Sequence, residues 1–149
     1  MPVFTLVSDV RKVVETLRAR YGEYKLAMLY NSAALDVPTN WNLIVSSDWA
    51  DKLGIAEATR RIGYELHLSL ELENRAAVSR VTVLRTNDPF VRDMTHLYPV
   101  SGNQTGLPIS NVVAGEITEG AGFVFYSQPE VPAEACFHWK MFPSAFDRA

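Results

Sequence analysis

The order of the apolar patterns along the chain is the feature that most restricts its fold. Segments with apolar residues at helical spacing alternate with short apolar runs of strand length. The first helix is predicted over 10–21, with Ser8 and Asp9 as caps and Gly22 as the stop signal. Strands are predicted at the apolar or β-branched runs 24–30, 41–45, 78–84 and 123–126. This order predicts a mixed β-sheet with helices packed on it, an α/β (α+β) domain.

The segment after the second strand supports two interpretations. The apolar residues Ile55, Ala58, Ile62 and Leu66 have helical spacing, and good helix formers dominate, so a long helix is the favoured prediction. Alternating leucines also run through residues 66–72, which is the period of a half-exposed strand. Residues 64–73 therefore stay open between helix and strand.

Capping and turn residues divide the second half of the chain. Asp88 and Pro89 predict a short helix to about Leu97, because Asp caps a helix and proline suits its first turn. Residues 98–108 contain two prolines and two glycines and are predicted to be a surface loop. A further helix is predicted over 111–119, where Ser110 supplies the cap.

Length and composition indicate one domain over residues 1–149, with a core of about 8–127 and an aromatic tail at 128–149. The formal net charge is −3 and basic residues do not collect into a block, so a nucleic-acid partner is not expected. The single cysteine, Cys136, excludes an intrachain disulfide and disfavours a thiolate zinc site. Since neither a signal peptide nor a membrane-spanning run is recognisable, we expect a cytoplasmic protein without membrane contact.

Two half-motifs, at residues 26–32 and 39–45, resemble the core of the minimal nucleotidyltransferases. In that family one strand runs into Gly-Ser, and a following strand carries Asp-x-Asp before an apolar run. Here Ser32 matches the serine, Asn31 stands in place of the glycine, and Asn40 and Asn42 stand in place of the two aspartates. The segments 78–84 and 116–126 resemble the third strand and the helix-Gly-strand ending of small members.

The resemblance implies a pseudoenzyme, because the residues that it replaces carry the chemistry. Two residues apart on a strand share a face, so the family's two carboxylates hold Mg²⁺ against a nucleotide. Asparagine keeps the shape but lacks the charge that hard cations prefer. The resemblance therefore implies a degenerate nucleotide site at Asn31, Ser32, Asn40 and Asn42, without a metal, a cofactor or a catalytic residue. The expected role is that of a binding or regulatory module.

Two other functions remain open. The first is an active nucleotidyltransferase that uses displaced carboxylates such as Asp36, Glu71 or Glu73. The second is an unrelated α/β interaction protein, a homo-oligomer or a partner-binding chain that buries the aromatic tail around residues 137–146. The three histidines lie far apart without metal-ligand spacing, and a nucleophile elbow is not recognisable.

Overall fold

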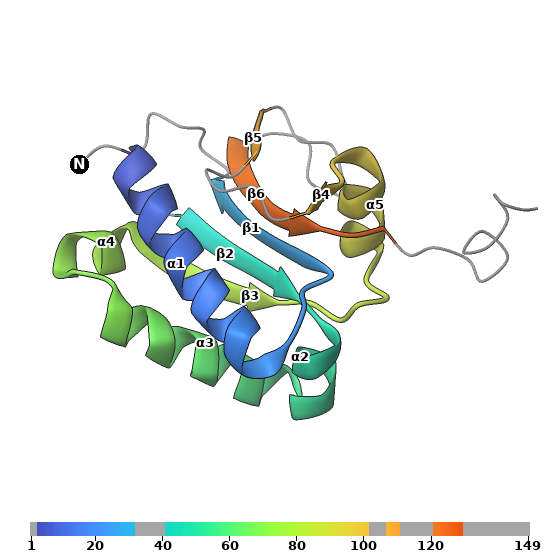
Figure 1. Cartoon of the computed structure of the whole chain (residues 1–149), viewed down its shortest axis with the longest axis horizontal. Coiled ribbons are helices and arrows are strands. Elements are labelled where there is room, and N and C mark those ends of the chain that lie inside the picture. The colour runs from blue at the N-terminus through green and yellow to red at the C-terminus, as the bar shows by residue number, and fades with distance from the viewer. Residues whose placement is uncertain (1–2, 32–40, 102–106, 111–120, 130–149) are drawn as a thin grey trace, which may run out of the picture.

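The computed structural model describes residues 3–31, 41–101, 107–110 and 121–129 (Figure 1). Its centre is a six-stranded mixed sheet in the order β3-β2-β1-β6-β4, with β5 paired to β6 as well. Strands β2 and β3 run parallel, and the other pairs are antiparallel. The strands are β1 (Leu26–Asn31), β2 (Trp41–Ser46), β3 (Val78–Val83), β4 (Val100–Ser101), β5 (Leu107–Ser110) and β6 (Ala121–Ser127). The mixed sheet and the α+β class predicted from the sequence are confirmed.

Five described helices pack on the two faces of this sheet: α1 (Val3–Tyr21), α2 (Asp48–Leu53), α3 (Ile55–Ser69), α4 (Leu72–Ala77) and α5 (Pro89–Leu97). Helices α1 and α3 cover one face, where side chains such as Leu17, Trp41 and Phe125 are almost fully buried. Helix α5 lies on the other face and buries Val91 and Met94 in a smaller core. Each central strand therefore contributes alternate side chains to two cores, which is why its sequence is apolar throughout.

Local signals in the sequence explain several element boundaries. The Asp88 carboxylate accepts a hydrogen bond of 2.8 Å from the Phe90 N–H, so it caps α5 as predicted. Gly22 ends α1 with φ +127, a conformation that favours glycine, and its N–H donates to the Arg18 carbonyl at 2.9 Å.

The predicted start of the first helix is wrong, since α1 begins at Val3 and contains both proposed caps. Leu6 and Val7 are buried and extend the apolar stripe by one turn, so the helix gains core contacts before Ser8. The predicted loop at 98–108 contains β4 and the first residues of β5, which pair with β6. The helix predicted over 111–119 and the tail from 130 lie outside the described residues.

Residues 64–73 are resolved in favour of the helix. Helix α3 continues to Ser69, and α4 starts at Leu72 after a short break. Leu66 and Leu70 are buried while Leu68 and Leu72 are exposed, which is the four-residue spacing of a helix face. In a half-exposed strand all four leucines would share one face.

In the part of the chain that the structure describes, none of the helices combines the length and the apolar character needed to span a bilayer.

Candidate functional site

The nucleotide site predicted from the sequence is only partly covered by the structure. Ser32 and Asn40 lie outside the described residues. Asn31 ends β1 and is fully buried, whereas Asn42 lies on β2 and is half-buried. Tyr30 is the cross-strand partner of Asn42, so Asn31, one residue further, points to the opposite face of the sheet. The two asparagines therefore lie on neighbouring strands but face different sides.

The Asn42 amide takes part in a contact between strands. Its Oδ1 atom accepts a hydrogen bond of 3.0 Å from the hydroxyl of Thr82 on β3. Arg80, the register partner of Asn42 in the parallel pair, points to the same face of the sheet. A neutral amide oxygen that is already hydrogen-bonded, with an arginine on the adjacent strand, makes a poor ligand for a divalent cation.

Among the described residues, the displaced carboxylates Glu71 and Glu73 do not lie at this position. Asp36 lies outside the described residues. Glu71 occupies the position before α4 without a capping side-chain hydrogen bond, and Glu73 lies in the first turn of this helix; both are exposed to solvent. Helix α4 packs through Ala77 into the core on the α1 and α3 side, which is the face opposite to Asn42.

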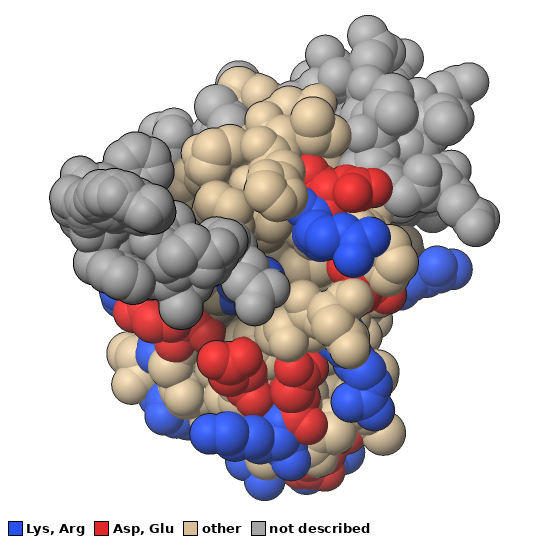
Figure 2. Space-filling model, turned by 90° about the vertical axis from the view of Figure 1, so that its right-hand side faces the viewer, with Lys and Arg blue, Asp and Glu red and all other residues tan. Residues whose placement is uncertain are grey.

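A polar crevice of about 440 Å³ lies at the other end of the sheet, outside the carboxyl ends of the parallel strands β2 and β3. In α/β sheets, ligands bind preferentially at this end. The crevice is lined by the polar side chains of Glu23, Lys25, Asp48, Thr86, Asn87 and Gln128. Figure 2 faces this end of the molecule, and acidic and basic side chains intermingle on its described surface.

The loops around the crevice are held by specific hydrogen bonds. Ser47 caps α2, with its hydroxyl accepting from the Ala50 N–H at 3.1 Å. The Asp51 carboxylate accepts from the Thr86 hydroxyl at 2.7 Å and so joins α2 to the segment after β3. The Gln128 N–H donates to the Lys25 carbonyl at 2.9 Å. These contacts join the segments around the crevice in two pairs, α2 with the residues after β3 and Lys25 with Gln128.

Acidic and basic side chains both line the crevice, but its two carboxylates, Glu23 and Asp48, are not equally available to a ligand. Glu23 pairs with Arg18 at 2.7 Å, and this hydrogen bond is the main reason that the pKa of Arg18 is raised. Asp48 is exposed at the start of α2 and lines the same crevice as Lys25 and Gln128. The crevice can therefore hold a small polar ligand through hydrogen bonds and one ion pair.

The perturbed titratable groups lie mainly where α1 meets α3 and β6. Hydrogen bonds from Arg60 and Arg61 lower the pKa of Glu57 to about 2. Burial, together with the hydrogen bond to Glu15, raises the pKa of Tyr126 to about 12. Both shifts move the pKa further from neutrality, so they stabilise the ordinary protonation states and indicate structural roles.

Burial also raises the pKa of Tyr24, whose hydroxyl donates to the Val14 carbonyl at 2.9 Å. This buried hydroxyl is a structural link between α1 and the start of β1. Within the four described stretches, groups of three or more His, Cys, Asp or Glu residues that could hold a metal ion are absent.

Sequence reasoning missed the crevice, although a signal for it exists. Polar residues follow both strands within a few positions, as Ser47-Asp48 directly after β2 and Thr86-Asn87 three residues after the end of β3. They point to one site only when β2 and β3 are known to be parallel and adjacent, because only then do both carboxyl ends meet at one edge. Lys25 and Gln128 join them from the antiparallel neighbours.

Comparisons of the chain with protein-family models, with curated proteins and with solved structures find no match. The fold class and the local chemistry therefore carry the functional argument.

Proposed function

We propose that this chain is a catalytically impaired, nucleotidyltransferase-like binding module. One observation carries the proposal: the Asn42 amide oxygen accepts a hydrogen bond from the Thr82 hydroxyl, at a position where the resemblance calls for a metal-binding carboxylate. The adjacency of β1 and β2 supports the resemblance, because both half-motifs then belong to neighbouring strands.

The absence of charge at position 42 is the physical reason for the impaired chemistry. Phosphoryl transfer needs divalent ions to neutralise the charge that develops on the transferring group. Asparagine supplies a neutral oxygen, and Arg80 on the adjacent strand adds a positive charge to the same face. A nucleotide held here binds without Mg²⁺ and is not turned over.

Calorimetric titration with ATP and with GTP, each with and without Mg²⁺, tests this function. We expect weak binding of a nucleotide with an affinity that is the same with and without the metal. Strong Mg²⁺-dependent binding would contradict the impaired site, and no binding of either nucleotide would contradict a nucleotide module.

A pair of designed variants sharpens the test. The double variant Asn40→Asp/Asn42→Asp restores both carboxylates of the motif, so we expect it to gain Mg²⁺-dependent nucleotide binding. Asn87→Asp is the matched control, because it adds a carboxylate in the crevice at the other end of the sheet. Circular dichroism confirms that each variant is folded. If both variants respond equally to Mg²⁺, the residues at positions 40 and 42 are not arranged as a metal site.

A second candidate function, a homo-oligomeric interaction protein, is favoured by exposed apolar residues on one helical surface. Tyr64 and Leu68 lie one turn apart on α3, with exposed fractions of 63% and 61%, and Leu72 at the start of α4 is 74% exposed. Neighbouring large apolar side chains in water are typical of interaction surfaces. Light scattering of the wild type, of Tyr64→Ser/Leu68→Ser and of a chain without residues 129–149 gives the mass in solution. A monomeric wild type rejects this candidate.

A further inference from the structure

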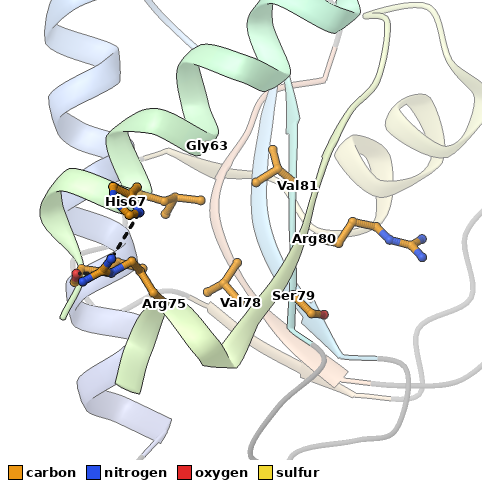
Figure 3. Close-up of a pocket in the computed structure, with 9 residues that line it drawn as sticks. Gly63, His67, Arg75, Val78, Ser79, Arg80 and Val81 are labelled. Atoms are coloured by element: carbon orange, nitrogen blue, oxygen red, sulfur yellow. Dashed lines mark hydrogen bonds between the residues drawn. The ribbon is translucent and has the colours of Figure 1, made fainter. Parts of the chain in front are cut away.

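A second cavity, separate from the crevice and from Asn42, lies between α3, α4 and β3 (Figure 3). Its volume is about 360 Å³, within the lower range of pockets that hold small ligands. Leu66 and Leu70 line it from the helical side, and Val78 and Val81 point into it from β3. Arg80, between the two valines, directs its side chain to the far side of the strand. These aliphatic side chains form one part of the lining, and polar residues such as His67, Arg75 and Ser79 form the rest.

Gly63 keeps this cavity open on the α3 side. A Cβ atom at Gly63 would meet nothing within 4 Å. Glycine in the middle of a helix weakens it relative to alanine, so the gap is not required for the stability of α3. Any other residue at this position of α3 would place a side chain in the space that Gly63 leaves empty.

Arg75 and His67 form the polar end of the cavity. The Arg75 Nε atom donates to the Leu70 carbonyl at 3.1 Å, and its Nη1 atom lies 3.2 Å from Nδ1 of His67. Arginine has only donors, so a hydrogen bond between these two atoms requires Nδ1 to accept, which is the tautomer with its proton on Nε2. These two bonds fix the guanidinium and leave it with unused donors.

The Arg75 charge has no counter-ion among the described residues. Arg20 pairs with Glu65, and Arg60 pairs with Glu57. For Arg75, in contrast, no carboxylate of the described segments lies within ion-pair distance. A fixed, uncompensated guanidinium beside aliphatic side chains is suited to an anion with an apolar body.

We propose that this pocket binds a small carboxylic acid with an aliphatic body. The carboxylate pairs with the Arg75 guanidinium beside His67, and the aliphatic part lies against Leu66, Leu70 and Val81 under Gly63. A planar, singly charged carboxylate matches one guanidinium through two parallel hydrogen bonds, whereas a phosphate dianion would need further cations. The pocket lies on the face opposite to Asn42, so this inference goes beyond the proposed function and stands independently of it.

Titration of the isotope-labelled full chain with octanoate, followed by amide NMR shifts, tests the proposal. We expect saturable shifts in α3, α4 and β3 with a Kd of about 1 mM or lower. Acetate lacks the aliphatic body, and octylamine carries the opposite charge, so neither should saturate the same shifts. The absence of saturation with octanoate up to about 10 mM overturns the proposal.

Three variants separate the parts of the pocket. Arg75→Met keeps the aliphatic stem but removes the charge and should weaken octanoate binding about tenfold or more. Gly63→Leu fills the cavity from α3 and should abolish binding in a chain that remains folded. Arg80→Met is the matched control, because Arg80 belongs to the lining but directs its side chain to the far side of β3, so the loss of its charge should leave the Kd unchanged. Equal effects of Arg75→Met and Arg80→Met would show a general charge effect and reject the site.

Discussion

The substitution Gly122→Ala tests the close pairing of β1 and β6 at the centre of the sheet. A Cβ atom on Gly122 would lie 2.3 Å from the Leu29 carbonyl oxygen and 3.2 Å from the Tyr30 Cα. An ordinary contact needs about 3.4 Å, so the two strands would have to separate by about 1 Å. Both neighbours are backbone atoms and cannot rotate away.

The expected loss follows from what this separation disrupts. Two ladder hydrogen bonds around the Tyr30 and Gly122 pair are put at risk, each worth about 1 kcal/mol. Overpacking in a close-packed region adds about 1–3 kcal/mol. We therefore expect Gly122→Ala to lower the free energy of unfolding by about 3–5 kcal/mol, and the Tm by about 10–15 °C.

Gly63→Ala is the matched control, since the same methyl group enters open space on a helix. We expect it to raise the free energy of unfolding by about 0.5–1 kcal/mol, through helix propensity and a less flexible unfolded chain. Urea denaturation of both variants and the wild type measures the two changes. A loss smaller than about 1 kcal/mol for Gly122→Ala would refute the reasoning, because β1 and β6 could not then be packed as closely as described.

Three further predictions concern single side chains. Ser47→Ala removes the cap of α2 and should cost about 1 kcal/mol in urea denaturation, and an unchanged midpoint would contradict the capping role. Glu57, whose pKa falls from 4.5 to about 2 beside Arg60, should contribute stability above pH 4.5 that is lost towards pH 2. Glu57→Gln should flatten this pH dependence, and salt should weaken it because the carboxylate is exposed. Burial and the Glu15 bond raise the pKa of Tyr126 from 10.0 to about 12, so stability should fall as the pH rises between these values. Absorbance titration of Tyr126→Phe should lack the ionisation near pH 12, while the more deeply buried Tyr24 still ionises late.

The candidate site was less accessible to sequence reasoning than the fold. Asn42 could be placed on a strand from its apolar neighbours, but its bond to Thr82 joins residues 40 positions apart. The crevice assembles Lys25, Asp48, Asn87 and Gln128 from separate segments that only strand pairing brings together. Side-chain patterns report which face is buried, and they carry little information about which strands are neighbours.

The sequence by itself determined the local structure of most elements and the class of the fold. Apolar runs specified β1, β2, β3 and the centre of β6, and Asp88-Pro89 specified the start of α5, because these signals act within a few residues. Only the tertiary structure decided between helix and strand at residues 64–73, where burial of Leu66 and Leu70 selects the helix. It also decided the parallel pairing of β2 with β3, and so the position of the crevice, because that pairing depends on contacts between distant segments.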